Sequence, residues 1–432
     1  MLRFAPSPTG EMQIENLRIA LLNALLSRQR NEPLLIRIED TEAARNVEGK
    51  DKEILEILNL FGIEYSDAVY QSAHLRFHRG MAIQLLQEKR AFNCFCTPRE
   101  LDRKRKRAEE ENLPFRYDDV CTDLRPEETI DNENPFTIRL KRPETAIGFT
   151  DLIRGESRFA PEDVDSFVIM DTEKLPAYNF ACAVDDMLTD VSLVIRGEEH
   201  FADTPKQIAV RNALGYDKEI VYAHLPAVLN DAGEKMSEGD DASSVRWLLE
   251  QGYLPEAIGN YLILLGNETP TEIFSIAEAV AWFDLKAISP SPVRFDIEKL
   301  RLVNREHLRR LDAKELSRYV GFADADIGEV AKIYLEEAAT TQELRTKIAP
   351  IFAPKVIPDA YAEAAGKIRA VIKAAPFFET FDGFKAHIMQ ESGLNDENLT
   401  APLRILLTGA EDGPELAGLY TYLKNYLGEI VK

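Results

Sequence analysis

The stretch from Arg3 to Arg18, RFAPSPTGEMQIENLR, has the residue types and the spacing of an anion-binding loop. Residues 2–5 indicate the end of a buried strand, and Pro6 and Pro8 then fix φ and end strand pairing. From Ile14 onward the apolar residues recur on one face of a helix. A strand that passes through a Gly-containing turn into a helix directs free backbone N–H groups and the positive end of the helix dipole to one place. The stretch therefore predicts a phosphate site, and an ordinary strand-to-helix connection is the alternative that spacing leaves open.

The elements around this loop alternate between strands and helices, which predicts a parallel sheet. A second apolar strand is expected at 34–38, and a helix at 54–61 is closed by Gly62. Residues 75–174 interrupt the alternation and form an expected α+β insertion. From about residue 295 the pattern is helical, with helices expected at 313–322, 328–348, 358–380 and 414–430. We therefore predict an α/β fold in which a Rossmann-like parallel-sheet catalytic domain carries an α+β insertion and precedes an all-α C-terminal region.

Length and composition bound the class of protein. At 432 residues the chain is expected to form two to four domains. No apolar run reaches the ~18 residues of a membrane helix, and the four cysteines are too unevenly placed for a disulfide framework. We expect a cytoplasmic protein with no membrane partner and, because no coiled-coil stripe demands one, a monomer. The net charge of −22 argues against nucleic acid as a partner, although a local basic face remains compatible with it.

Eight residues, RFAPSPTG at 3–10, resemble the start of the glutamyl-tRNA synthetases, a family of class I aminoacyl-tRNA synthetases. Similar segments continue along the chain: RIEDT at 37–41, LPAYNF at 175–180, RGEEH at 196–200, FDIEKLRLVNREHLRRL at 295–311 and PLRILLTG at 402–409. The resemblance implies a catalytic domain at 1–74 and 175–230, an acceptor-binding insertion at 75–174, a signature loop and stem-contact region at 231–300, and an anticodon-binding domain at 301–432.

The implied reaction has two steps. The carboxylate of L-glutamate attacks the α-phosphate of ATP, supplied with Mg²⁺, and the terminal ribose hydroxyl of tRNA then attacks the adenylate. The implied nucleic-acid partner is tRNA(Glu), and acceptance of tRNA(Gln) stays open.

The resemblance assigns the glutamate pocket to Arg3, Ser7, Glu39, Tyr178 and Arg196. Two arginines suit a substrate with two carboxylates, because a guanidinium can bind a carboxylate through two parallel hydrogen bonds. Glu39 suits the ammonium group. The alternative for Glu39 is a solvated helix cap, and the alternative for Arg196 is a salt bridge to the acidic pair at 198–199.

The ATP site departs from the family pattern. The resemblance assigns ATP binding to Thr9, Gly10, Glu15, His200, Lys235 and Glu238, and catalytic contacts to Gln13, Lys235 and Ser237. The family has His-x-Gly where this chain has Gln13 and Glu15, and Lys-Met-Ser-Lys-Arg where it has Glu238 and Gly239. At ~6 Å and an effective dielectric constant near 20, each lost positive charge is worth on the order of 3 kcal/mol before screening. We therefore expect weakened glutamate activation.

Three cysteines resemble a zinc knuckle that some family members carry. Cys94 and Cys96 are followed by Cys121, and the place of the fourth ligand holds Asp123. Asp is uncommon in closed structural zinc sites, and Tyr117 is a further candidate donor. Structural zinc on Cys94, Cys96, Cys121 and Asp123 is thus weighed against buried, reduced thiols.

Two functions from different classes follow. The first is a glutamate–tRNA ligase whose activation step is weakened. The second is a catalytically impaired paralogue that acts as a non-catalytic tRNA-binding or regulatory protein. A shortened tRNA-modifying glutamyl transferase fits poorly, because such proteins lack the helical C-terminal region.

Overall fold

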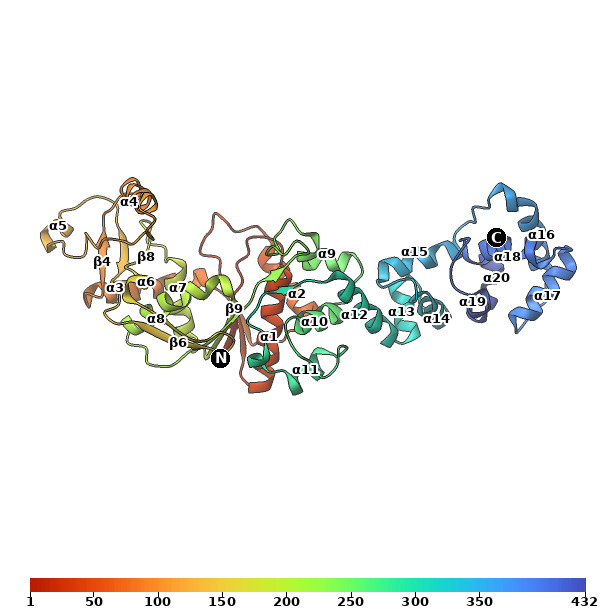
Figure 1. Ribbon diagram of the computed structural model, residues 1–432, viewed down its shortest axis with the longest axis horizontal. Coiled ribbons are helices and arrows are strands. Elements are labelled where there is room, and N and C mark those ends of the chain that lie inside the picture. The colour runs from red at the N-terminus through yellow and green to blue at the C-terminus, as the bar shows by residue number, and fades with distance from the viewer. The chain divides into compact units, whose positions relative to one another are not determined.

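The computed structural model describes the backbone of residues 1–432 and the side chains except those of Pro126 and Ile130, and over this range the chain divides into two compact units (Figure 1). The first unit comprises Met1–Val245, Leu262–Pro270 and Ser275–Phe295. The second comprises Arg246–Tyr261, Thr271–Phe274 and Asp296–Lys432. The segment 231–300, which we expected to be a part of its own, is therefore shared between the two units.

The main sheet of the first unit has the order β3-β2-β1-β9-β10-β6-β7 among the described residues. Its strands are β1 (Leu2–Phe4), β2 (Leu34–Ile38), β3 (Asp67–Tyr70), β6 (Ile147–Asp151), β7 (Gly155–Phe159), β9 (Leu193–Gly197) and β10 (Val221–Leu225). Every neighbouring pair is parallel except β6 and β7, so the predicted parallel sheet is confirmed. β6 and β7 belong by sequence to the expected insertion, yet they extend the main sheet.

Helices follow the strands as a parallel sheet requires. They are α1 (Ile14–Arg30), α2 (Lys50–Leu60), η1 (Gln71–His74), α3 (Leu75–Gln87), α7 (Tyr178–Leu188), η2 (Glu198–Asp203) and α8 (Thr204–Ala213). The apolar face predicted for α1 is buried at Leu17, Leu21 and Leu25, and the helix packs against β1 and β9. This packing holds the loop between β1 and α1 at the carboxyl edge of the sheet.

The insertion contributes a small antiparallel sheet of its own. It consists of β4 (Ala91–Cys94), β5 (Thr137–Leu140) and β8 (Val168–Met170), with α4 (Pro98–Glu110), α5 (Pro126–Ile130) and α6 (Pro161–Val164) in the connections. Thr97 caps α4 through a capping box with Glu100. The run of five basic residues at 103–107 lies on α4, which buries none of its described residues and is therefore a solvated helix.

The remaining elements are short or helical. The signature segment carries β11 (Val228–Leu229), η3 (Asp241–Ser243), α9 (Val245–Glu250), α10 (Pro255–Leu264), α11 (Ile276–Trp282), η4 (Leu285–Ala287) and β12 (Val293–Arg294). The second unit continues with α12 (Ile297–Arg310), α13 (Ala313–Tyr319), α14 (Ala325–Tyr334), α15 (Thr341–Phe352), η5 (Asp359–Tyr361), α16 (Ala362–Ala374), α17 (Phe381–Ser392), α18 (Asp396–Thr408), α19 (Leu416–Leu423), η6 (Lys424–Tyr426) and α20 (Leu427–Ile430).

The all-α C-terminal region is confirmed. The single helix predicted at 328–348 is wrong, because Thr340 caps a new helix by accepting the backbone N–H of Glu343.

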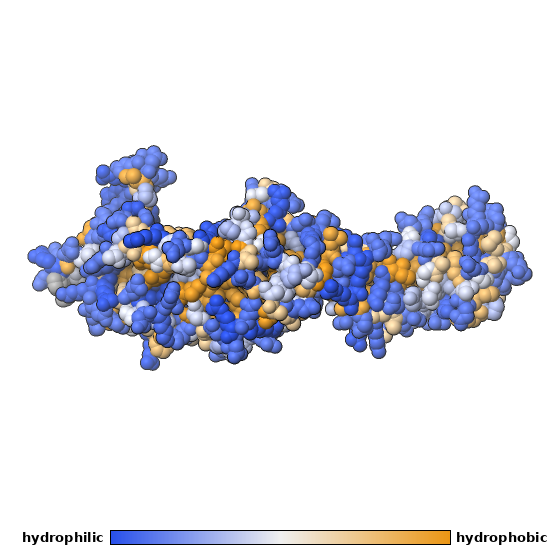
Figure 2. All heavy atoms as spheres, turned by 60° about the horizontal axis from the view of Figure 1, so that its bottom comes forward, coloured by the Kyte–Doolittle hydropathy of each residue, from blue (hydrophilic) through white to orange (hydrophobic). Residues whose placement is uncertain are grey.

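The face of the molecule in Figure 2 is mainly hydrophilic, as expected for a chain with 74 acidic and 52 basic residues. Among the helices described, none combines the length and the apolar character needed to cross a bilayer.

Candidate active site

Four parallel strands, β1, β2, β9 and β10, end at one edge of the sheet. Arg3 and Arg196 lie within β1 and β9, and further predicted site residues lie in the segments that follow these strands. One pocket at this edge is lined by side chains from the loop after β1, the end of β2, the start of α7 and η2. Five predicted residues are among them: Ser7, Thr9, Glu39, Tyr178 and His200. The structure thus gathers residues that lie up to almost two hundred positions apart in the sequence.

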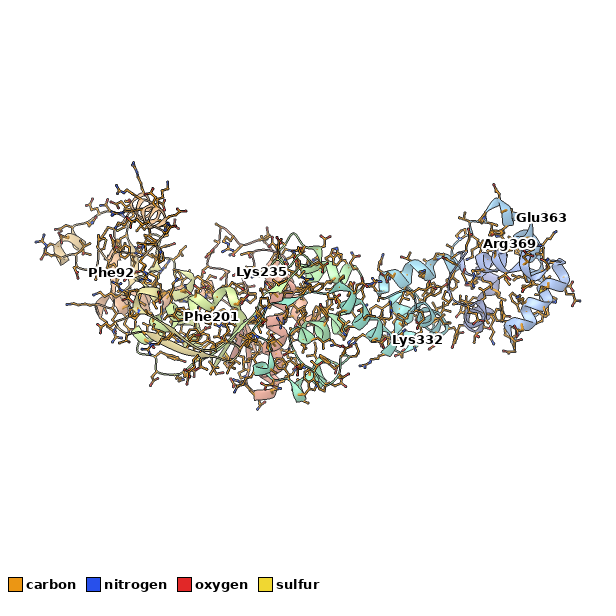
Figure 3. All side chains as sticks on the ribbon, in the orientation of Figure 1. Phe92, Phe201, Lys235, Lys332, Glu363 and Arg369 are labelled. Carbon is orange, nitrogen blue, oxygen red and sulfur yellow. The ribbon has the colours of Figure 1, made fainter. Side chains whose placement is uncertain are left out.

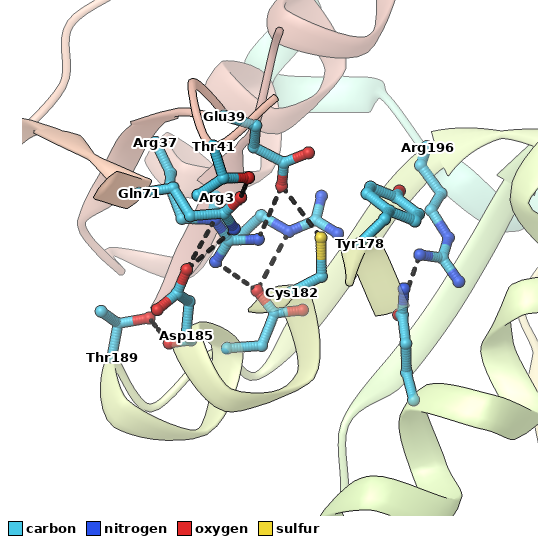
Figure 4. A network of polar contacts seen from close by, with 12 residues as sticks. Arg3, Arg37, Glu39, Thr41, Gln71, Tyr178, Cys182, Asp185, Thr189 and Arg196 are labelled. Atoms are coloured by element: carbon cyan, nitrogen blue, oxygen red, sulfur yellow. Dashed lines mark hydrogen bonds and ion pairs between the residues drawn. The ribbon is translucent and has the colours of Figure 1, made fainter. Parts of the chain in front are cut away.

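Arg3 and Glu39, two of the residues predicted to bind glutamate, belong to a buried network of charges (Figure 4). Arg3 donates from Nε to Asp186 Oδ1 over 3.4 Å. Arg37 donates to the same oxygen over 2.6 Å and to Glu39 Oε1 over 3.2 Å. The thiol of Cys182 also donates to Glu39 Oε1, over 3.1 Å. Glu39 is only 8% exposed, so the solvated-cap alternative is wrong.

Asp186 is charged in spite of its burial. Burial alone would raise the pKa of its carboxyl, but the guanidiniums of Arg37 and Arg3 outweigh burial and lower it to about 2. The same pairing raises the pKa of Arg37 well above its ordinary value, against the effect of its own burial. Arg37 therefore bridges two carboxylates: Glu39, which is predicted to bind the ammonium group, and Asp186, which holds Arg3.

Arg196 is a buried cation whose partners are neutral. It is 5% exposed and donates to His224 Nε2 (3.0 Å), Gln207 Oε1 (2.9 Å) and Thr204 Oγ1 (2.7 Å). The predicted alternative, a salt bridge to residues 198–199, is wrong, because Glu198 pairs with Arg154 and Glu199 with Lys235. Among the side chains that the structure describes, no carboxylate lies within 4 Å of Arg196. A buried guanidinium in this state favours an anionic ligand.

Tyr178 and His200 connect the two ends of the pocket. The Tyr178 hydroxyl lies 3.2 Å from His200 Nδ1, and this nitrogen lies at the same distance from Asp203 Oδ2. Burial raises the pKa of the Tyr178 phenol well above its ordinary value. Tyr178 is thus a neutral hydrogen-bonding wall of the pocket, beside the charges of Glu39 and Arg196.

Glu15, at the predicted nucleotide site, already engages a backbone N–H donor and a lysine. Its Oε1 accepts the backbone N–H of Val228 over 2.9 Å, and its Oε2 lies 3.7 Å from Lys235 Nζ. Burial raises the pKa of the Glu15 carboxyl, while the Val228 amide and the Lys235 ammonium act in the opposite direction. Gln13 precedes α1 as its N-cap residue, but its amide donates to the Glu11 carbonyl instead of capping the described helix.

The signature loop, which carries Lys235 (Figure 3), lies close to the first loop of the chain. Lys235 is shared between Glu15 and Glu199, with Nζ 3.3 Å from Glu199 Oε2. A Cβ atom added to Gly10 would lie 3.2 Å from Glu238 Oε1, so the carboxylate that replaces the family's lysine faces the predicted phosphate turn. Ser237 donates its backbone N–H to Asp240 over 2.9 Å. The residues predicted to bind the nucleotide therefore lie close together, but Lys235, their cation, is already paired with two carboxylates.

The three predicted cysteine ligands lie close together in the insertion. The sulfur atoms of Cys94, Cys96 and Cys121 all lie within 4.8 Å of one another. The Tyr117 hydroxyl lies 3.3 Å from Cys94 Sγ and 3.5 Å from Cys96 Sγ. Among the described residues Asp123 does not belong to this group of donors, and the Tyr117 hydroxyl is a further donor beside two of the sulfur atoms.

Several residues of the site were not predicted from the sequence. Arg196 donates hydrogen bonds to His224, Gln207 and Thr204. Asp186 and Arg37 hold Arg3 and Glu39. Arg196 and His224 are register partners on β9 and β10. A histidine at a strand end is a weak signal on its own, and its role depends on which strands are neighbours.

A Rossmann-like parallel sheet with charged pockets at its carboxyl edge is the architecture of a nucleotide-dependent enzyme. The family model described as tRNA synthetases class I (E and Q), catalytic domain, matches residues 1–302, and the chain belongs to this family.

Relatives and solved structures agree over the full length. The chain is 64% identical to "Glutamate–tRNA ligase 2" of Sulfurimonas denitrificans and 53% identical to "Glutamate–tRNA ligase 1" of Nitratiruptor sp., covering 100% of each chain in both cases. The crystal structure of a glutamate tRNA ligase from Elizabethkingia meningosepticum in complex with its amino acid superposes with a TM-score of 0.84 at 25% identity. That superposition covers 100% of this chain and 98% of that one.

Proposed function

We propose that the chain is a glutamate–tRNA ligase that activates L-glutamate with Mg-ATP and transfers it to the 3′ end of tRNA(Glu). The buried Arg196, with three neutral partners, is the observation that carries this proposal. Together with Arg3 it offers two cations to the two carboxylates of glutamate, while Glu39 offers one anion to the ammonium group. The pocket thus has the charges of this amino acid in complementary form.

The chain's residues act by positioning the reactants and by offsetting charge. No covalent enzyme intermediate is required, because the glutamate carboxylate is itself the nucleophile toward the α-phosphate. Tyr178 and Ser7 border the bound amino acid. The turn at Thr9 and Gly10, with His200 and Gln13, offers hydrogen-bond donors to the nucleotide. Lys235 supplies a cation at this end, and Ser237 follows it on the same loop.

We propose that both units contact tRNA, the insertion at 75–174 at the acceptor end and the helical region at 301–432 at the anticodon. The reaction belongs in the cytoplasm, where tRNA is used, and we expect the ligase to act as a monomer. The names of the relatives support tRNA as the partner, and acceptance of tRNA(Gln) is an open part of the proposal.

The test is tRNA-dependent ATP–pyrophosphate exchange with L-glutamate, run on the unmodified chain and on a variant carrying Gln13→His, Glu15→Gly, Glu238→Lys and Gly239→Arg. We expect slow exchange by the unmodified chain and a gain on the order of a hundredfold in the variant. The Val228 N–H becomes free, Lys235 keeps only Glu199 of its two carboxylate partners, and the substitutions at 15, 238 and 239 together shift the local charge by +4. A Cβ at Gly239 would meet only Ser237 Oγ at 3.6 Å, so the arginine fits.

The control is Glu363→Lys on α16 (Figure 3), which makes the same charge change as Glu238→Lys at an exposed position of the second unit and should leave exchange unchanged. Full exchange by the unmodified chain without a gain in the variant would refute the weakened activation step. Glutamate binding without exchange in either protein would instead favour a non-catalytic tRNA-binding or regulatory role.

We also propose a structural zinc ion on Cys94, Cys96, Cys121 and Tyr117. The four donors fit a small tetrahedral site in number and proximity, and thiolates are preferred zinc ligands. Zinc there would hold β4 to the loop that carries Tyr117 and Cys121. It would supply folding energy to the insertion and take no part in the reaction.

Metal analysis of the purified protein is expected to find about one zinc per chain. Tyr117→Phe should weaken zinc retention against a chelator by about tenfold or more, whereas Asp123→Asn, the ligand first predicted, should leave it unchanged. Equal retention by both variants would exclude Tyr117 as a ligand, and loss only in the Asp123 variant would restore the original set.

A further inference from the structure

His224 lies between a carboxylate and a guanidinium in the interior of the first unit. It is fully buried, with Nδ1 2.6 Å from Asp151 Oδ2 and Nε2 3.0 Å from Arg196 Nε. The Nε atom of arginine always carries a hydrogen, so Nε2 of His224 accepts. The one ring hydrogen of a neutral imidazole therefore belongs on Nδ1, where Asp151 accepts it.

Asp151 is itself held firmly. Its Oδ1 accepts the backbone N–H groups of Ile153 and Arg154, both over 2.9 Å, and its Oδ2 also accepts the backbone N–H of His224 over 3.0 Å. A carboxylate with this many donors stays ionised and stays in place. Asp151 thus sets both the tautomer and the orientation of the imidazole.

The three hydrogen bonds to Arg196 leave part of its guanidinium available. An arginine has five N–H donors, and His224, Thr204 and Gln207 take one each on Nε, Nη2 and Nη1. Five minus three leaves two, one on each terminal nitrogen, which is the pair that binds a carboxylate through two parallel hydrogen bonds.

We propose that His224, oriented by Asp151, is a positioning residue that aims the free edge of Arg196 at a glutamate carboxylate, and that its neutral form is required for tight glutamate binding. This inference rests on the proposed function for the identity of the ligand. His224 acts only through Arg196.

The surroundings of His224 define the expected pH dependence. The charged groups facing it are Asp151, Arg196 and Arg154, and the rings packed around it belong to Tyr222, Phe149 and Phe201. Burial lowers the pKa of His224, and the two arginines lower it further, while Asp151 opposes them. When pH falls through this lowered pKa, Nε2 gains a hydrogen and confronts Arg196 with a like charge. Glutamate affinity should therefore be lost on the acidic side of the ordinary imidazole range.

Two substitutions of His224 test the roles of its two ring nitrogens separately. The amide of Gln reaches the position of Nε2 and can still accept from Arg196, whereas the amide of Asn reaches only the position of Nδ1. Calorimetric titration with L-glutamate at pH 8 should show His224→Asn weakened by about tenfold to a hundredfold, and His224→Gln within a few fold of the unmodified chain. Between pH 8 and 5.5 the unmodified chain should lose affinity, and His224→Gln should lose this pH dependence.

Exchange assays on the same proteins should show the change in KM for glutamate and not in KM for ATP. His387→Gln, on α17 of the second unit, is the control and should behave as the unmodified chain. Equal binding by the Asn and Gln variants, or unchanged pH dependence in His224→Gln, would overturn the inference. If His224→Asn does not fold, the pH profiles of the other two proteins decide.

The outcome is distinguishable from failure of the proposed function. Glutamate binding with the predicted pattern but without exchange would support His224 as a positioning residue and refute the ligase proposal. Exchange with no effect of His224 variants would do the reverse. A chain that binds no glutamate at any pH would refute both.

Discussion

Replacing Arg196 by Gln is expected to lower kcat/KM for glutamate by about a thousandfold, or on the order of 4 kcal/mol. Gln can replace one hydrogen bond but not the buried positive charge that the substrate carboxylate requires. The loss should appear mainly in KM for glutamate, with KM for ATP changed by no more than a few fold, and steady-state exchange kinetics measure both.

Arg211→Gln is the matched control for this substitution. Arg211 is a similarly buried guanidinium on α8, and it donates to the Tyr222 hydroxyl over 2.7 Å. It shares none of the three hydrogen-bond partners of Arg196, so its removal should spare KM for glutamate. Equal rises in KM for glutamate and ATP in Arg196→Gln would point to a general structural defect, and unchanged kinetics would remove Arg196 from the pocket.

Replacing Arg37 by Met is expected to lower the free energy of unfolding by about 3–5 kcal/mol, measured by urea denaturation at pH 7. Arg37 is completely buried and pairs with Asp186, Glu39 and Asp185, so its loss leaves three buried carboxylates without their shared cation. The double variant Arg37→Met with Asp186→Leu should recover part of the loss, because it removes one of those charges.

The pH dependence of this pair has a definite sign. The pKa of Asp186 is about 2 in the folded protein and ordinary, near 4, in the unfolded chain. Because the folded state binds the proton less readily, the stabilisation is fully present above about pH 4 and is lost as pH falls from 4 to 2. Arg37→Met should lack the share of this stabilisation that Arg37 supplies at neutral pH, while Arg3 still pairs with Asp186. An unchanged urea midpoint in Arg37→Met would show that the pair contributes no stability.

The local pattern of the sequence was sufficient for the elements. The prolines at 6 and 8 ended β1, and the apolar face from Ile14 made α1, as hydrophobic periodicity and fixed φ angles require. The alternation of strands and helices gave a parallel sheet. The prediction of one helix at 328–348 was wrong because it relied on hydrophobic periodicity, which does not reveal a helix start signalled by the single N-cap residue Thr340.

For the site, too, the sequence predicted some features and left others to the tertiary structure. The family resemblance predicted Arg3, Glu39 and Arg196 for the glutamate pocket, and their charges match this substrate whatever their partners are. The sequence could not decide those partners. It left a salt bridge open for Arg196, which the structure replaces by His224, and it named Asp123 where the structure brings Tyr117 to the cysteines.

The anion-binding loop shows most clearly what the sequence determined and what only the tertiary structure decided. From the sequence alone it was possible to say that Glu15 brings a negative charge where the family has glycine, because a residue's charge and volume are properties of its type. Only the tertiary structure decided that this carboxylate accepts the N–H of Val228, 213 residues away, and shares Lys235 with Glu199. Hydrogen-bond partners depend on strand order and helix packing, which bring distant segments together, and no local pattern encodes that proximity.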